Sequence, residues 1–160
     1  MKNKGMFLES LLNKTISFYE KNMVGMFHKK PIPINFNSVK KGREVNQAWI
    51  ASKSTVDYYG IYKGIFIAFE AKSTRLKSLP LVNIKYHQID YLNKVNTLGG
   101  LGFFVIYYDT YDEYFLLLPG DLEGLDQKSL NIDVARKKGY SLEVMYPGIL
   151  DFASVLDNLL

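Results

Sequence analysis

The chain has 160 residues, 48% of them hydrophobic, which suits one domain with a real core and is short for two. Cysteine is absent, which excludes disulfides, thiolate metal sites and cysteine nucleophiles, and two histidines are too few to favour a zinc site. The 20 Lys and Arg residues exceed the 16 Asp and Glu residues, and the net charge of +4 gives a modest bias towards polyanionic partners.

The N-terminal stretch MKNKGMFLESLL lacks the basic-then-apolar order of a signal peptide, because Glu9 interrupts it. No apolar run approaches the ~18 residues of a membrane-spanning helix. We therefore expect a soluble, cytoplasmic protein that has no membrane partner. Apolar residues from Leu8 to Met23 recur at helical spacing and predict an amphipathic helix over residues 6–21.

The next part of the chain changes character twice. VGMFHKK is typical of a short strand, but Pro31 and Pro33 in PIPINFNSVKKGR then oppose both a helix and a central strand. The polar and basic residues that follow lack a packing face, so we expect residues 31–43 to form a projecting stalk or mobile loop. A short helix is predicted around residues 44–51, and its apolar residues would be Val45, Trp49 and Ile50.

The stretch STVDYYGIYKGIFIAFEAKST is typical of a β-hairpin with Lys63-Gly64 as its tight loop, where glycine supplies the positive φ. Tyr62 then pairs with Ile65, which fixes the register of the two strands.

In that register Asp57 lies directly across from Glu70, and Thr55 lies across from Lys72. Side chains alternate along a strand, so Glu70 and Lys72 share one face of an otherwise apolar strand. An ordinary surface ion pair is the plainer interpretation of these two residues, but the apolar context favours a functional site.

The remaining elements complete an α/β pattern. KYHQIDYLNKVNTLGG predicts a helix, GFFVIYY and EYFLLL predict two strands joined by a turn, and ILDFASVLDNLL predicts a closing helix. The order of elements predicts a mixed central sheet flanked by helices in a single domain of residues 1–160. Acidic residues gather between Asp109 and Asp126 and basic clusters lie elsewhere, which suggests a basic and an acidic face or, more simply, a solvated surface.

The facing carboxylates indicate a chemistry. Opposed side chains have Cβ atoms roughly 4.5–5.5 Å apart, and two carboxylates at that distance repel each other unless a cation binds them. Mg²⁺ prefers carboxylate oxygens together with water and phosphate oxygens, which Asp57 and Glu70 would provide. Lys72 would stabilise charge on a phosphate or help deprotonate a metal-bound water. The pattern therefore favours phosphodiester hydrolysis.

Gln88 lies on the apolar stripe at the start of the helix after the hairpin. Its amide would orient a metal-bound water or provide an oxygen ligand. An amide at a helix N-terminus is equally often a local hydrogen-bonding group, and spacing alone does not choose between these roles.

These residues resemble the Asp…Glu-x-Lys signature of the PD-(D/E)xK nuclease superfamily and, more closely, the RecU family of Holliday junction resolvases. NKGMFLES resembles that family's opening motif, HKKPIPI resembles its His-Lys-Lys-Pro-Thr-Pro segment, and the hairpin follows its catalytic hairpin almost residue by residue. SLPLVNIKYHQIDYL and GFFVIYY continue in the same order, so the resemblance covers roughly residues 3–120.

The resemblance implies a restriction-endonuclease-like nuclease fold and a homodimer that cuts symmetric strands of a four-way DNA junction beside a RecA-type recombinase. Lys72 would stabilise the transition state, and the Mg²⁺ site, with Mn²⁺ as the alternative ion, would consist of Thr55, Asp57, Glu70 and Gln88. The segment beginning at Pro31 would be a stalk that reaches towards the junction centre. The basic residues that we then expect to contact DNA are Lys4, Lys29, Lys30, Lys40, Lys41, Arg43 and Arg75.

The chain departs from the family motif at three positions. Lys4 stands where Arg is usual, Val56 replaces a usual Thr, and Tyr59 replaces a usual Asn. None of these changes removes a metal ligand, but Lys does not reproduce a bidentate Arg contact, so junction affinity or sequence preference is expected to differ. Glu9 either approaches the site from the first helix, as in related resolvases, or is an exposed carboxylate.

Two other functions fit the same residues. One is a nuclease of this superfamily that acts on damaged or foreign duplex DNA. The other is a non-catalytic junction binder that modulates a recombinase.

Overall fold

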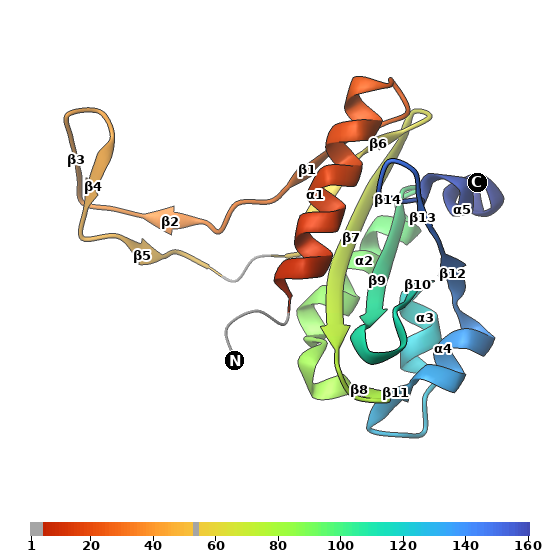
Figure 1. Cartoon of the computed structure of the whole chain (residues 1–160). Coiled ribbons are helices and arrows are strands. Elements are labelled where there is room, and N and C mark those ends of the chain that lie inside the picture. The colour runs from red at the N-terminus through yellow and green to blue at the C-terminus, as the bar shows by residue number, and fades with distance from the viewer. Residues whose placement is uncertain (1–4, 53–54) are drawn as a thin grey trace.

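The computed structural model describes residues 5–52 and 55–160 (Figure 1). Within these residues a six-stranded sheet has the order β1-β6-β7-β9-β10-β12. The strands are β1 Met26–Lys29, β6 Tyr58–Tyr62, β7 Ile65–Thr74, β9 Leu101–Tyr108, β10 Glu113–Leu117 and β12 Tyr140–Leu142. β7 and β9 are parallel and the other neighbours are antiparallel, so the predicted mixed sheet is confirmed.

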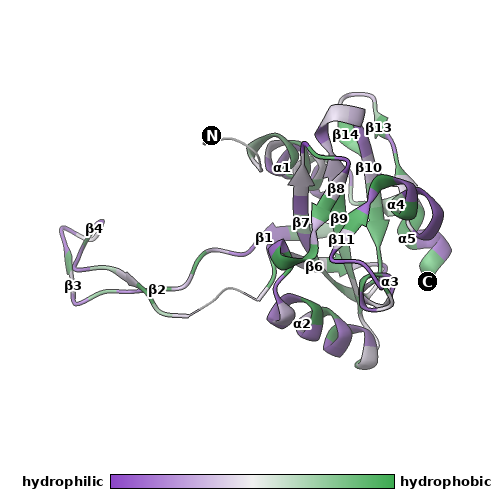
Figure 2. Cartoon of the chain, turned by 90° about the horizontal axis from the view of Figure 1, so that it is seen from below, coloured by the Kyte–Doolittle hydropathy of each residue, from purple (hydrophilic) through white to green (hydrophobic). Residues whose placement is uncertain are grey.

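Helices cover both faces of the sheet, as Figure 2 shows for α1 and α2 on opposite sides. On one side α1 (Met6–Lys21), at the predicted residues, packs with α5 (Ala153–Leu159) against a core that contains Leu12 and Leu156. On the other side lie α2 (Tyr86–Thr97), α3 (Pro119–Glu123) and α4 (Ile132–Lys138), with a second core. α2 is the crossover that two parallel neighbouring strands require.

The predicted alternation along β7 is confirmed. Ile67 and Phe69 belong to the α1 side of the sheet, whereas Ala68 belongs to the α2 side, which Glu70 shares by alternation. The ring of Phe69 is stacked between Tyr58 and Phe103, with centroids 4.7 and 5.0 Å away. These aromatic contacts join the hairpin to β9 on the face of the sheet opposite Glu70.

The C-terminal part differs from the sequence prediction. Ile149 and Leu150 form β14 (Ile149–Leu150), which pairs with β13 (Val144–Met145), so the closing helix begins only at Ala153. Another small ribbon joins β8 (Ser78–Pro80) to β11 (Ser129–Asn131), and short 3-10 turns are Leu81–Asn83 and Asp109–Tyr111. Across the described parts of the chain, no helix has both the length and the apolar composition for crossing a membrane.

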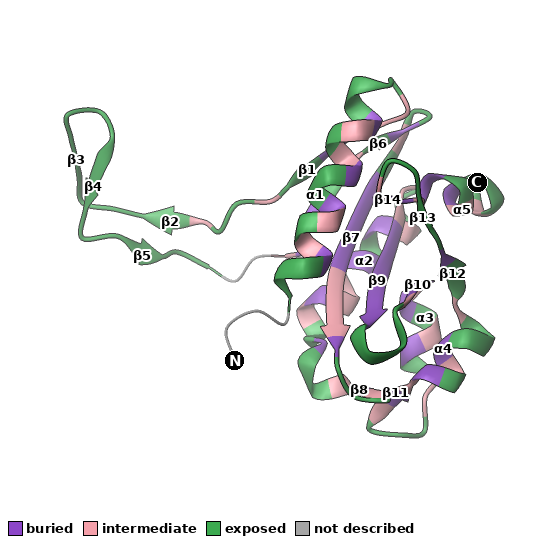
Figure 3. Cartoon of the chain, in the orientation of Figure 1, coloured by how far each residue is buried: buried purple, intermediate pink, exposed green. Residues whose placement is uncertain are grey.

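Between β1 and β6 the chain leaves the body as a thin arm, which we call the stalk, residues 31–52 (Figure 1). β2 (Ile34–Asn35) pairs with β5 (Trp49–Ile50), and β3 (Ser38–Lys40) pairs with β4 (Glu44–Asn46) near the tip. Figure 3 shows it almost wholly exposed, in contrast to the buried strands β7 and β9.

The helix predicted around residues 44–51 is therefore wrong. Its apolar spacing fits a helix only where a core accepts the apolar side, and the stalk has no core. Instead Val45 pairs with Val39, and Ile50 pairs with Ile34, so cross-strand pairing satisfies the backbone. Gly42, with φ of 68°, allows the reversal at the tip.

Candidate metal centre and DNA-binding surface

The hairpin of β6 and β7 has the register that the sequence predicts. Tyr58 pairs with Phe69 at the end of the ladder, and Gly64 has a φ of 80°, as the tight loop requires. Asp57 precedes the ladder by one residue and lies beside Glu70, because its backbone N–H donates to Glu70 Oε2 at 2.9 Å. Asp57 and Glu70 are thus neighbours, at the point where β6 begins.

Glu70 lies in a buried polar cluster and is itself only 3% exposed. Its Oε1 accepts a hydrogen bond from Gln88 Nε2 at 2.8 Å and lies 3.1 Å from Lys72 Nζ. Burial and, after it, the charge of Asp57 raise the pKa of Glu70 from 4.5 to about 7, although Lys72 opposes the rise. A bound cation would favour the ionised carboxylate and so relieve this cost.

Asp57 and Lys72 border the same cluster from its more open side. Asp57 Oδ2 accepts a hydrogen bond from the Ala71 backbone N–H at 3.2 Å, which holds the carboxylate against β7. The Lys72 side chain is 20% exposed, so its ammonium group is reachable from solvent while it remains paired with Glu70. This position suits a cation that approaches a phosphate next to the two carboxylates.

The amide of Gln88 is oriented by its partners. The Lys85 backbone N–H donates to Gln88 Oε1 at 3.0 Å, and a backbone N–H can only donate, so the atom that it meets is the oxygen. The nitrogen therefore points at Glu70. In this arrangement Gln88 caps the start of α2, which is the local role, and also holds Glu70 through its nitrogen. Its role at the metal, as an oxygen ligand or through a bound water, stays a prediction.

Thr55 is joined to the base of the stalk. Its Oγ1 accepts a hydrogen bond from Lys30 Nζ at 2.6 Å, and the Lys30 backbone N–H donates to the Asp57 carbonyl oxygen, also at 2.6 Å. Lys30, expected only as a DNA contact, therefore links the stalk to two of the predicted metal-site residues.

Glu9 of α1 faces the site from the other side of the hairpin. It forms an ion pair with Lys29, and both residues line a small hollow of ≈ 80 Å³ together with Asp57. Of the two interpretations of Glu9, this placement favours an approach to the site over an isolated surface carboxylate.

The donor set fits a hard divalent ion. Asp57 and Glu70 offer carboxylate oxygens side by side, and the hydroxyl of Thr55 belongs to the same hairpin. Among residues 5–52 and 55–160 no group of three or more His, Cys, Asp or Glu side chains converges on a metal position. A pair of carboxylates completed by water and phosphate oxygens is the coordination that Mg²⁺ commonly adopts.

The residues expected to contact DNA divide into three groups. Lys40, Lys41 and Arg43 lie at the exposed tip of the stalk, and Lys29 and Lys30 lie at its base. Arg75 follows β7 and is paired with Asp109 at 3.2 Å. Lys4 lies outside the described residues.

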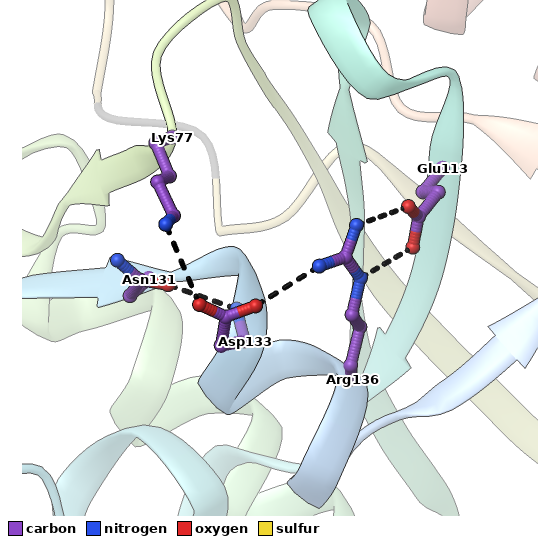
Figure 4. A network of polar contacts seen from close by, with 5 residues as sticks. All are labelled: Lys77, Glu113, Asn131, Asp133 and Arg136. Carbon is purple, nitrogen blue, oxygen red and sulfur yellow. Dashed lines mark hydrogen bonds and ion pairs between the residues drawn. The ribbon is translucent and has the colours of Figure 1, made fainter.

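The predicted separation of acidic and basic faces fails near α4. Arg136 binds Glu113 in a bidentate pair and also contacts Asp133 at 2.9 Å, and Asp133 in turn lies 3.6 Å from Lys77 (Figure 4). This network joins the β8–β11 ribbon to the main sheet. Arg136 of the basic cluster is thus paired with Glu113, an acid of the segment that was expected to form a separate face.

Sequence reasoning missed one set of residues beside the site. Tyr59, Phe66 and Tyr91 line a hollow together with the base of the stalk. The alternation along β7 already places Phe66 on the face of Glu70, and a large apolar side chain on the face of the predicted site was the available signal.

Comparisons with known proteins identify the family. A sequence model of the family described as RecU, Recombination protein U, matches residues 3–158. The chain belongs to the RecU family. The match extends beyond the motifs of the hairpin and includes the stalk and the C-terminal part of the chain.

Relatives within the RecU family match over nearly the whole chain. The Holliday junction resolvase RecU of Mycoplasmopsis pulmonis (strain UAB CTIP) is 42% identical over 159 residues, covering 99% of this chain and 97% of the relative. The protein of that name from Staphylococcus aureus (strain JH9) is 36% identical over 169 residues, covering 98% of this chain and 81% of the relative.

The fold has a solved counterpart. Hjc of Archaeoglobus fulgidus, a Holliday junction resolvase from an archaeal hyperthermophile, superposes with a TM-score of 0.52 and covers 83% of this chain and 94% of its own. Its sequence is 10% identical, so the likeness concerns the fold. The nuclease fold expected for the RecU family is thereby confirmed.

Proposed function

We propose that this chain is a Mg²⁺-dependent endonuclease that resolves Holliday junctions by cutting two symmetric strands, in homologous recombination and DNA repair. The observation that carries the proposal is the arrangement around Glu70. Its carboxylate lies beside Asp57, is held by Gln88 and is 3.1 Å from Lys72. We infer the four-way junction as substrate because relatives that match nearly the whole chain are named Holliday junction resolvases.

Each side chain of the site has a task in this proposal. Asp57 and Glu70 hold Mg²⁺, with Mn²⁺ as an alternative, and Thr55 completes the set. The ion, when bound, supplies a Lewis acid and lowers the pKa of a coordinated water. Lys72 stabilises the negative charge that develops on the phosphate oxygens.

Gln88 has a supporting task in the geometry described above. It donates a hydrogen bond to Glu70 Oε1, which fixes the direction of this oxygen. Through Lys85, the same amide is fixed to the start of α2. Such outer contacts orient metal ligands and make them effective.

DNA binding falls to the basic residues along the stalk and around the site. Phosphate contacts supply most of the affinity of such proteins and make it depend on salt. The contacts that we assign to phosphates come from Lys4, Lys29, Lys30, Lys40, Lys41, Arg43 and Arg75. The exposed stalk tip would reach the junction centre, while Lys30 lies next to the cleavage site.

Two copies of the chain would act together. A four-way junction has twofold symmetry, and a homodimer places one site on each of two equivalent strands. We further propose that the dimer works in the cytoplasm beside a RecA-type recombinase, as the family resemblance suggests.

Comparison of two substrates tests the proposal. Purified protein is incubated with a four-way junction or with linear duplex of equal length, each with Mg²⁺ or with EDTA. We expect paired nicks in the junction, with Mg²⁺ only, and little cutting of the duplex. Equal cutting of both substrates would indicate a general nuclease, and junction binding without nicks in Mg²⁺ or Mn²⁺ would indicate a binder.

A further inference from the structure

A second hollow opens beside the proposed metal centre, on the same face of the sheet as Glu70. Its volume is ≈ 460 Å³. It lies where the stalk leaves the body and faces the middle of α2, which contributes Tyr91. Its main lining residues come from the stalk base, the hairpin and α2, and are Lys30, Pro31, Pro33, Tyr59, Phe66 and Tyr91.

The aromatic rings in this hollow are accessible. Tyr59 is 37% exposed and Phe66 is 44% exposed, whereas Ile67 and Phe69 of β7 are fully buried. Tyr59 pairs with Ala68 and Phe66 pairs with Ile61, so the two rings are diagonal neighbours on one face of the hairpin. They form an open aromatic floor beside Tyr91 of α2.

Lys30 joins the hollow to the site. Its ammonium group donates to Thr55 Oγ1 at 2.6 Å and lies 5.9 Å from the ring centroid of Tyr91, so it stands at the boundary. Along β7, Phe66 precedes Glu70 by four residues, about 13 Å at the rise of an extended strand. At 3.4 Å per base pair that is about four steps of duplex, and fewer nucleotides in an unstacked strand.

We propose that this hollow, which we call the aromatic pocket, binds one unstacked base of the DNA strand that is cut. The base would stack on Tyr59 and Phe66, while Lys30 contacts the adjoining phosphate. This inference rests on the proposed function, because it takes the cut strand to pass the metal centre. It adds a contact that positions the strand for cleavage.

Three features favour a base over other occupants. The pocket is continuous with the metal centre through Lys30, so a strand bound there already passes it. Its lining combines aromatic faces with a cation, the combination that binds single-stranded nucleic acid. A junction interrupts continuous stacking at its branch point, where a base is less costly to unstack than inside a duplex.

Removal of single bases tests the proposal. Junctions carry one abasic site at a time, at positions within about four nucleotides of the cut. Cleavage rates are measured with enzyme in excess for the natural chain, Phe66→Ala and Tyr59→Ala. Met145→Ala is the control, because Met145 is 50% exposed, about as accessible as Phe66, and lies on β13, outside the pocket.

The expected result is a coupling between one base and the two rings. At one position, loss of the base slows the natural chain and the Met145→Ala variant by roughly tenfold or more. Phe66→Ala and Tyr59→Ala are slowed on the intact junction and lose most of this further response. A response to base loss that is the same in all four proteins, or absent at every position, overturns the proposal.

The other occupant to consider is a second copy of the chain. If Phe66→Ala converts a dimer into monomers in analytical ultracentrifugation while the abasic response persists, the pocket belongs to a subunit interface and the proposal is wrong. Failure of the proposed function looks different, because then the natural chain leaves intact junctions uncut. A natural chain that cuts junctions but has a flat abasic response contradicts the pocket alone.

Discussion

The end of β7 and the stalk are built in opposite ways. Glu70 is 3% exposed and has hydrogen-bonding or ionic partners from the hairpin and from α2. Trp49, by contrast, lies in a two-residue strand and is 49% exposed. A two-stranded ribbon is at best marginally stable in water without something to pack on. The side chains around Glu70 are thus held in place within the chain itself, whereas in our proposal the stalk gains its stabilising contacts from the DNA that it binds.

The largest effect that we expect comes from a change in the residues around Glu70. Lys72→Met removes the ammonium group and keeps the length of the side chain. Single-turnover cleavage should fall by roughly a hundredfold or more, because charge on the phosphate loses its stabilising partner. Junction affinity, measured by fluorescence anisotropy, should change little.

Lys77→Met is the control for Lys72→Met, since Lys77 follows the same strand but pairs with Asp133 away from the site. It should cleave at the natural rate. Equal losses in both variants would show that charge near β7, and not the position of Lys72, matters.

Changes in the stalk should weaken DNA binding and leave the cleavage step largely intact, the reverse of what we expect for Lys72. Replacing Lys40, Lys41 and Arg43 together by Gln should weaken junction binding by roughly tenfold or more at low salt. The slope of log affinity against log salt should become shallower by about 3, close to one for each lost phosphate contact. Cleavage at saturating protein should fall much less than binding.

A triple Gln variant at Lys21, Lys63 and Lys137 removes the same charge far from the stalk. Its salt slope should stay within about one of the natural slope. If the two triple variants behave alike, net charge accounts for the binding and the stalk tip has no special role.

Two variants of Gln88 test whether this residue supports Glu70 or binds the metal itself. Gln88→Leu should weaken Mg²⁺ affinity by roughly tenfold, since contacts that orient metal ligands are worth 10–100-fold. Gln88→Glu keeps an oxygen for the Lys85 N–H but places a second carboxylate against Glu70. We expect it to weaken binding as well, measured by Mg²⁺ titration of cleavage. Tighter Mg²⁺ binding by Gln88→Glu would instead indicate a direct ligand.

The smallest effect concerns stability. The pKa of Glu70 is raised to about 7, so the folded chain holds this proton more tightly than the unfolded chain does. That stabilisation is complete below about pH 4.5 and is lost as the pH rises through about 7. In EDTA at pH 8, Glu70→Gln should therefore unfold with a free energy higher by on the order of 2–3 kcal/mol, and the gap should close near pH 4.

Denaturant titrations at both pH values measure this gap, and added Mg²⁺ provides the control. The ion should stabilise the natural chain and leave Glu70→Gln unchanged. If Glu70→Gln is less stable than the natural chain at pH 8 and equally stable at pH 4, Glu70 stabilises the fold in its charged form.

Much of the prepared site follows from local rules. The Lys63-Gly64 loop sets the register, and alternation along β7 then places Glu70 and Lys72 on one face. Contacts between distant segments do not follow in this way. The Lys30–Thr55 hydrogen bond depends on how β1 runs beside β6, and no local pattern encodes that pairing.

The stalk marks the other limit of sequence reasoning. Val45 and Ile50 have a spacing that fits a helix and also fits paired strands, and only the absence of a core beside the stalk decides between them. The aromatic pocket was missed for a related reason. Tyr91 joins Phe66 only through the packing of α2, so the two residues are unconnected in the sequence.

One measurement tests the central claim most directly. Cleavage of a four-way junction is followed against Mg²⁺ concentration for the natural chain and for Asp57→Asn, with junction affinity measured on the same samples. We predict that the natural chain cuts with a saturating dependence on Mg²⁺, and that Asp57→Asn binds the junction equally well but does not cut it at any concentration. Cleavage by Asp57→Asn at the natural rate would contradict the carboxylate pair as the metal centre.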